Sequence, residues 1–166
     1  MPTLIDANAL SNLASVDRLD LLDFLQDDIY LSSAAYDETQ RGIEEGYAFL
    51  ARVDRALADA HFSVTTLESE QEWRLYQTIP TKLHRGEAMS LAIARCRGWH
   101  LLTDDRAARA YARSLGVGCS GTLALLVRAI RVGCLTVDEA NYLLTEMIAR
   151  ARYRSQVRDL RDLLEE

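Results

Sequence analysis

Short apolar runs alternate along the chain with longer segments in which apolar residues recur every three or four positions. The short runs are typical of buried strands and lie at residues 3–6, 29–31, 62–66, 100–103 and 117–119. One of the longer segments shows the helical spacing well, because Met89, Ile93 and Cys96 recur at i, i+4 and i+7 before Gly98. Strands that alternate with such helices predict a parallel sheet with helices on both faces, an α/β/α sandwich of three layers.

The remaining helical patterns extend to the end of the chain. They are predicted at residues 10–16, 19–25, 32–41, 50–57, 68–77, 105–115, 123–130 and 137–147. A last apolar stripe comprises Val157, Leu160 and Leu164, so the C-terminal third is predicted to be all helical. We expect residues 1–133 to form the main domain. Residues 134–166 would form a helical C-terminal extension packed on that domain or on the partner of a homodimer.

Composition and charge narrow the class of protein. The chain has 166 residues, which argues for one domain, and 49% of them are hydrophobic, as in ordinary globular proteins. No run is long and apolar enough to span a membrane, and no basic segment precedes Asp6, so a cytoplasmic protein is expected. Three cysteines without CxxC spacing disfavour a disulfide framework or a zinc site. The net charge of −6 argues against a surface that coats nucleic acid, but it does not exclude a nuclease rich in metal-binding carboxylates.

Acidic residues follow two of the predicted strands. Asp6 ends the first, and Asp104 and Asp105 come directly after the strand at residues 100–103. Ligands of parallel α/β sheets bind beyond the carboxyl ends of the strands, and Glu38 and Glu87 begin helices that would face the same edge. Carboxylates gathered there would repel one another unless cations neutralise them. Mg²⁺ and Mn²⁺ prefer such oxygen ligands, and two of these ions can clamp the attacking and leaving oxygens of a phosphodiester.

Each acid also has an ordinary structural interpretation. Asp6 would cap the next helix, Asp104 would cap the helix at residues 105–115, and Asp105 would favour its dipole. Glu38 alone is more typical of a solvated helix face, and the position of Glu87 in a first helical turn is explained by the helix dipole. The joint arrangement is therefore more informative than any single acid.

The same residues give the chain a resemblance to a known family. The motifs are Asp6-x-Asn8 after the first strand, Glu38 in an early helix, Gly86-Glu87 at the start of an alanine-rich helix, and Thr103-Asp104-Asp105 after a later strand. Together they resemble a PIN domain over residues 3–132. The match is closest to the bacterial and archaeal branch with an Asp-Asp-x-x-Ala-Arg motif, here residues 104–109, and with a Gly-Thr-Leu turn, here residues 121–123.

The resemblance implies a metal-dependent endoribonuclease that uses Mg²⁺ or Mn²⁺. It implies Asp6, Glu38, Glu87 and Asp105 as catalytic acids. Of these, Asp6, Glu87 and Asp105 would bind the metal directly with Asp104 as an auxiliary ligand, and Glu38 would support a second ion or orient the attacking water. Asn8 and Thr103 would hydrogen-bond the ligand carboxylates.

The partners follow from the same resemblance. RNA is the implied substrate, and such proteins are often toxins paired with an antitoxin protein. Independently of the resemblance, Arg106, Arg109 and Arg113 recur near the proposed pocket, where they would either steer a phosphate backbone toward the acids or pair with them. The alternatives are a non-catalytic PIN-fold module that binds a protein partner, and a metal-dependent phosphatase on a similar sheet.

Other signals carry less information. A dinucleotide site needs a strand before its G-x-G-x-x-G motif, but the match at residues 116–121 follows a predicted helix and has its strand inside the match. Trp73 and Trp99 are interpreted as packing residues. The arginines between Arg150 and Arg161 would either bind RNA phosphates, with Tyr153 stacking on a base, or form a solvated helix face with i+4 partners.

Overall fold

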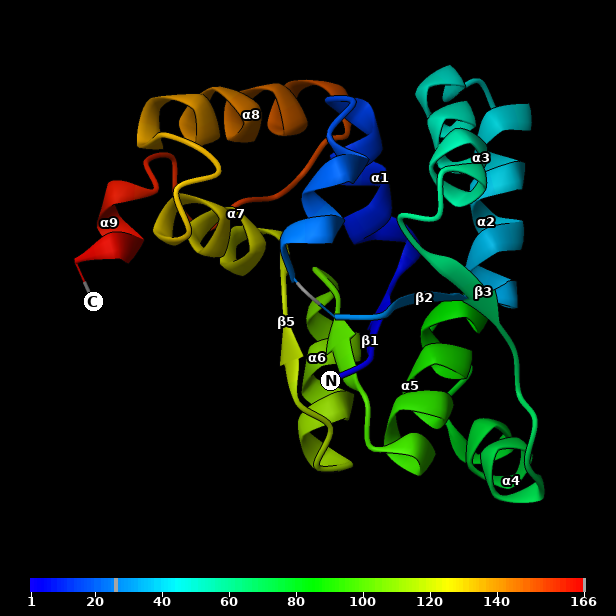
Figure 1. The fold of residues 1–166 in the computed structure, drawn as a ribbon. Helices are drawn as coiled ribbons and strands as arrows, with labels where there is room; N and C mark the ends of the chain where they lie inside the picture. The colour runs from blue at the N-terminus through cyan, green and yellow to red at the C-terminus, as the bar shows by residue number, and fades with distance from the viewer. Residues whose placement is uncertain (26, 166) are drawn as a thin grey trace.

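A central sheet of parallel strands organises the molecule. In this computed structural model, which describes residues 1–25 and 27–165, five strands form one sheet in the order β3-β2-β1-β4-β5 (Figure 1). Their bounds are β1 Thr3–Ile5, β2 Ile29–Ser32, β3 Ser63–Thr65, β4 His100–Leu102 and β5 Cys119–Ser120. Every neighbouring pair is parallel. The predicted α/β fold is therefore confirmed, with β5 beginning two residues later than its pattern indicated.

Helices cover both faces of the sheet. They are α1 Ala7–Ser15, α2 Ser33–Glu44, α3 Ala51–Ala58, α4 Glu70–Thr78, α5 Arg85–Arg97, α6 Arg106–Ser114, α7 Thr122–Arg131, α8 Val137–Arg150 and α9 Arg161–Leu164, with 3₁₀ turns η1 Leu19–Leu25 and η2 Ala48–Leu50. Leu4 and Leu101 join the core beneath α4, α5 and α6, whereas Ile5 and Leu102 join the core beneath α1, α3, α7 and α8 (Figure 1). The three-layer α/β/α sandwich is thus built on the alternation of side chains along each strand.

Several helices begin directly after a strand, and capping side chains fix those junctions. Asp6 caps α1 after β1, Ser32 caps α2 at the end of β2, and Asp105 caps α6 after β4. Each cap oxygen accepts a hydrogen bond from a backbone N–H that the first helical turn leaves unpaired. These caps therefore place polar side chains at the carboxyl edge of the sheet.

The C-terminal extension is only partly helical, which corrects the expectation of an all-helical C-terminal third. α8 ends at Arg150, residues 151–160 form no helix, and α9 is a single turn. Arg152 has a φ of 55°, a left-handed conformation that interrupts the helix. Arg161 pairs with Asp138 and Asp159 instead of the i+4 partner that a continuous helix would provide.

The extension nevertheless packs on its own chain. Leu160 is fully buried in the α1-side core, and Tyr153, Val157 and Leu164 pack against the same core. Asn141 on α8 fixes the segment, since its Oδ1 accepts from Leu160 N at 2.8 Å. The apolar stripe therefore lies on an irregular segment that folds back over α8, and its side chains are buried against the core.

The three cysteines are free thiols. Among the described residues, none of the helices combines the length and apolar character that a membrane span requires.

Candidate active site at the carboxyl edge of the sheet

Asp6 lies at the centre of the candidate site. Because β1 and β4 pair with Ile5 opposite Leu102, Asp6 and Thr103 follow at the same edge. The Asp6 carboxylate accepts hydrogen bonds from Ala9 N at 2.7 Å and from the Thr103 hydroxyl, and only 1% of the residue is exposed. Burial raises the pKa of Asp6 from 3.8 to about 8, with smaller contributions from the charges of Asp104 and Glu87.

Glu87 and Asp105 flank this buried carboxylate. Glu87 is the third residue of α5, where its Oε2 accepts from His84 N at 3.0 Å in a capping box. Burial raises the pKa of Glu87, and the negative charge of nearby Asp105 raises it further. Asp105 Oδ1 accepts from Ala108 N at 2.7 Å, which leaves its second oxygen available for a ligand. Glu87 and Asp105 therefore lie close enough for their charges to interact.

Glu38 reaches the site from α2 because a glycine lets two helices approach closely. Glu38 Oε1 accepts from Gly86 N at 2.9 Å, at the start of α5. A Cβ at position 86 would lie 2.8 Å from that oxygen and 2.9 Å from the Cα of Ala35. Gly86 therefore has a packing role, and its contact orients the catalytic candidate Glu38.

Asp104 is held by the start of α7, which corrects its predicted role as the cap of the α6 helix. Its Oδ1 accepts from Thr122 N at 2.8 Å, and its Oδ2 accepts from Asn12 Nδ2 at 2.8 Å and from the Thr122 hydroxyl. The side chain that caps α6 is Asp105. A Cβ on Gly121 would lie 2.6 Å from Asp104 Oδ1, so glycine is required beside this carboxylate. Both Asp104 oxygens are thus engaged in fixing α7.

Thr103 and Asn8, which were expected to hydrogen-bond the ligand carboxylates, lie in different environments. Thr103 is fully buried and bridges two acids, because its hydroxyl donates to Asp6 and accepts from Asp105 N at 3.1 Å. Asn8 is exposed and lines the cleft described below. The position of Thr103 agrees with an orienting role.

The donor set suits a hard divalent cation, although the side chains do not form a ready chelate. All the candidate ligands are carboxylates, the oxygen donors that Mg²⁺ and Mn²⁺ prefer, and their mutual repulsion would be relieved by a cation. Among the described residues, no group of three or more His, Cys, Asp or Glu side chains is arranged to hold a metal ion. The carboxylates therefore fit the metal by chemistry, and binding would require them to turn toward one another.

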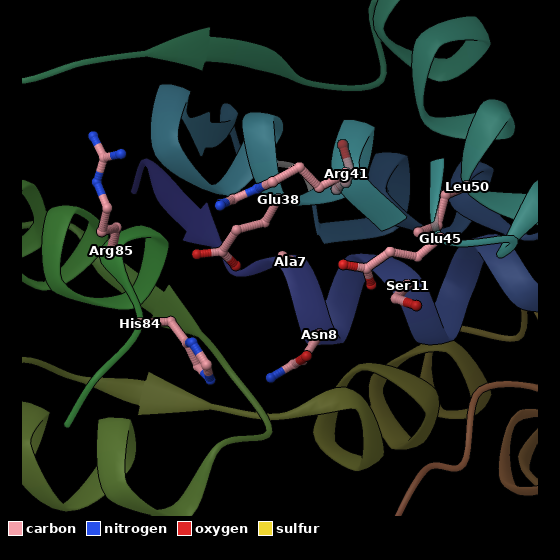
Figure 2. Close-up of a pocket in the computed structure, with 10 residues that line it drawn as sticks. Ala7, Asn8, Ser11, Glu38, Arg41, Glu45, Leu50, His84 and Arg85 are labelled. Atoms are coloured by element: carbon pink, nitrogen blue, oxygen red, sulfur yellow. The ribbon is translucent and has the colours of Figure 1, made fainter. Parts of the chain in front are cut away.

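A cleft of about 440 Å³ opens beside these acids (Figure 2). It lies between α1, α2 and the start of α5, and Glu38, Asn8 and His84 line it in the close-up. Arg41 and Arg85 bring cationic side chains to the same cleft. Sequence reasoning missed these two arginines and His84, because their convergence depends on how α2 packs against α5.

The predicted phosphate contacts lie elsewhere. Arg106 and Arg113 are exposed on α6, and Arg109 is half-buried on the same helix, so none of the three lines the cleft. Tyr153, for which stacking on a base was one interpretation, packs against the α1-side core beside Asp104. Burial raises the pKa of Tyr153, and the charge of Asp104 raises it further.

The structure thus defines an α/β/α domain with acidic side chains beyond the ends of neighbouring parallel strands. The chain belongs to the PIN-domain family, whose model matches residues 2–166 and so includes the C-terminal extension. A similar solved structure is that of PAE2754 from Pyrobaculum aerophilum, with 22% sequence identity and a TM-score of 0.54. The similarity covers 79% of this chain and 99% of that chain, and it supports the fold. Among curated proteins, no match to this chain was found.

Proposed function

We propose that the protein is a Mg²⁺- or Mn²⁺-dependent endoribonuclease that hydrolyses RNA phosphodiester bonds. The observation that carries the proposal is the meeting of Asp6, Glu87 and Asp105 at one edge of the sheet, where burial and repulsion raise the pKa values of Asp6 and Glu87. Such an arrangement is costly for a folded protein unless a cation or a protonation step uses it. Membership of the PIN-domain family agrees with a nuclease.

Each acid has a distinct place in the proposed chemistry. Asp6, Glu87 and Asp105 would hold the metal, and Glu38 would orient the attacking water or support a second ion. A bound divalent metal would supply an activated water and stabilise the departing 3′ oxygen. The Thr103 hydroxyl orients the Asp6 carboxylate by donating to it, and it fixes the backbone of Asp105 by accepting from Asp105 N. Asp104 would act indirectly, by holding α7 and Asn12 against the site.

The cleft beside the acids is the proposed binding place of the RNA substrate. Arg41 and Arg85 line it together with Glu38, so cationic groups lie next to a catalytic candidate. Guanidinium groups bind phosphate in a bidentate manner, and they would attract an RNA backbone toward an otherwise acidic edge. Arg106, Arg109 and Arg113 remain candidate contacts for a longer RNA.

A role as the toxin of a toxin–antitoxin pair, an antitoxin protein as partner, a homodimer and a cytoplasmic location are also part of the proposal. The toxin role and the antitoxin rest on the Asp-Asp-x-x-Ala-Arg and Gly-Thr-Leu motifs, the homodimer on the apolar stripe of the C-terminal extension, and the location on composition. The competing function is a non-catalytic protein-binding module, which is favoured by the lack of a preformed three-ligand group among the described residues.

An RNA cleavage assay separates the two functions. Purified protein is incubated with a mixed-sequence RNA in Mg²⁺, Mn²⁺ or EDTA, and Glu38→Gln is compared with Asp37→Asn, its exposed neighbour on α2. We expect metal-dependent cleavage that Glu38→Gln reduces at least tenfold and Asp37→Asn leaves unchanged. If the wild-type protein cleaves no RNA with either metal, the binding module becomes the better account.

A further inference from the structure

An exposed aromatic pair lies on α4, outside the acidic site. Trp73 is 49% exposed, although a packing role was predicted for it from the sequence. Its ring meets Tyr76 edge-on, with ring centroids 6.1 Å apart and an interplanar angle of 88°. Tyr76 is half-buried and packs against the core beneath α5, so it supports the more exposed indole. The pair therefore presents a fixed aromatic surface to solvent.

This aromatic pair is connected to the cleft through Arg85. The Arg85 guanidinium lies beside the Tyr76 hydroxyl, and this neighbour raises the pKa of Arg85. Arg85 also lines the cleft together with Glu38 and Arg41 (Figure 2). The helices agree with this continuity, because α4 packs beside α5, whose first residue is Arg85 (Figure 1). Trp73, Tyr76 and Arg85 thus form a strip, here called the Trp73 strip, that leads away from the catalytic acids.

Several acids near Trp73 have cationic partners. Glu70 is paired with Arg74 on the exposed face of α4, and Arg97 is shared by the buried Glu72 and the exposed Glu68. Within the strip itself the charged residue is the cation Arg85, so a phosphate that follows the strip would have its contact there.

The second tryptophan offers a contrast within the same chain. Trp99 is stacked on Tyr30 at 4.6 Å between ring centroids, and the guanidinium of Arg97 lies over its ring at 4.9 Å. Its ring is therefore already engaged by its own chain, as a packing role predicts. Within the described part of the chain, the aromatic contact of Trp73 is the edge-on one with Tyr76.

We infer that the Trp73 strip is a subsite for single-stranded nucleic acid, in which a base flanking the cleavage position stacks on Trp73 while Arg85 contacts the intervening phosphate. This inference rests on the proposed function and deepens it, because it assigns to Trp73 on α4 the binding of a base outside the acidic site. Aromatic side chains bind exposed bases by stacking, and every base has a face that suits them. Bases inside a duplex are already stacked and paired, so the strip would discriminate against double-stranded RNA.

Tryptophan fluorescence tests this inference without depending on catalysis. In Trp99→Phe the only indole is Trp73, and in Trp73→Phe the only indole is Trp99. A short single-stranded oligoribonucleotide, or the same sequence as a blunt duplex, is titrated into each variant in EDTA at low salt. We expect the single strand to quench Trp73 and leave Trp99 unchanged, and the duplex to quench Trp73 weakly.

Affinity and kinetics give the second readout. Trp73→Ala should weaken binding of the single strand about tenfold, within the range for loss of one base–aromatic stack, and Trp73→Phe should retain most of the affinity. With metal present, Trp73→Ala should raise KM for a long single-stranded RNA and leave kcat and the cleavage of a dinucleotide unchanged.

The outcomes separate this inference from the function on which it rests. If the wild-type protein cleaves RNA but the strand does not quench Trp73, or Trp73→Ala leaves KM unchanged, the subsite is refuted and the nuclease stands. Equal quenching by duplex and single strand would refute the preference for an unpaired strand. If the wild-type protein neither binds nor cleaves RNA, both proposals fail, and the exposed indole is better explained as a contact for another protein.

Discussion

Replacing Asp6 by asparagine should stabilise the metal-free protein while it abolishes RNA cleavage. The Asp6 carboxyl is 1% exposed, and burial raises its pKa to about 8. In the unfolded chain the pKa of the same group is near its ordinary value of 3.8. Folding at neutral pH therefore requires Asp6 either to take up a proton or to carry a buried charge, and asparagine removes that cost.

The size and pH dependence of the effect follow from these two values. Each pH unit between them costs about 1.4 kcal/mol, so the cost of folding with Asp6 is roughly 4 kcal/mol at pH 7. When folding raises the pKa of a group, the folded state keeps its full stability at pH values below the unfolded pKa. The folded state then loses stability as the pH rises toward the folded pKa. The cost is therefore near zero at about pH 4 and reaches its maximum above about pH 8.

Asparagine keeps most of the local contacts. Its carbonyl oxygen can accept the hydrogen bond from Ala9 N, whereas the bond from the Thr103 hydroxyl must be rearranged at a cost of about 1 kcal/mol. The net gain at pH 7 is then about 3 kcal/mol, or a rise in Tm of about 6–12 °C for a domain of this size.

Urea unfolding in EDTA at a series of pH values measures the effect. We expect the Asp6→Asn variant to be more stable than the wild type at pH 7, and the difference to shrink as the pH falls toward about 4. Asp37→Asn, an exposed carboxylate on α2, should show no such difference. A variant less stable than the wild type at pH 7, or a difference that does not change with pH, would refute the reasoning.

Three further predictions concern the surroundings of the site. Asp105→Asn should abolish cleavage with little loss of stability, because asparagine also caps helices. Asp104→Asn should lower the free energy of unfolding by about 1–3 kcal/mol, because one amide oxygen cannot replace both carboxylate oxygens. Cleavage and urea unfolding of both variants check this, and the reverse ranking of activity would refute the assignment. Gly86→Ala should cost about 1–3 kcal/mol and lower activity through Glu38, because its Cβ would meet Ala35 at 2.9 Å; unchanged stability would contradict the close approach. Truncation after Ala149 removes the buried Leu160 and should reduce solubility or change the elution volume in size-exclusion chromatography, and Leu160→Ala alone should cost about 2–5 kcal/mol in urea unfolding.

Much of the fold was predictable because its signals are local. The strand runs contain residues that become the sheet core, such as Leu4 and Leu101, and apolar periodicity marks the helices that cover them. The acids at the ends of β1 and β4 could be placed at one edge, since parallel strands share the direction of their carboxyl ends. The expected PIN-domain family followed from those same positions and is confirmed.

The errors arose where a long-range contact decides between local alternatives. Asp104 and Asp105 are both suitable caps for α6, and Asp104 is drawn to α7 only because β5 brings Thr122 beside it. The stripe of Val157, Leu160 and Leu164 has helical spacing, but Arg152 leaves the helix and Leu160 enters the core from an irregular segment. Periodicity alone could not reveal that conformation.

The cleft and the Trp73 strip were also beyond the sequence. Arg41 and Arg85 are far apart along the chain, and they line the same cleft because Gly86 allows α2 to approach α5. The exposure of Trp73 depends on which face of α4 turns toward α5, and a single tryptophan carries no local signal for that choice. In both cases the packing of helices supplies the information.

The most direct test of the central claim is a set of melting curves in EDTA, Mg²⁺ and Mn²⁺ for the wild type and Glu87→Gln. Glutamine can accept the hydrogen bond from His84 N, so the variant should fold while it loses a metal ligand. A metal at about 100 times its Kd stabilises the folded state by about 2.7 kcal/mol, and we therefore expect the wild-type Tm to rise by about 5–11 °C and that of Glu87→Gln to rise much less. No rise in the wild-type Tm at millimolar Mn²⁺, or an equal rise in both proteins, would contradict a metal site built on these carboxylates.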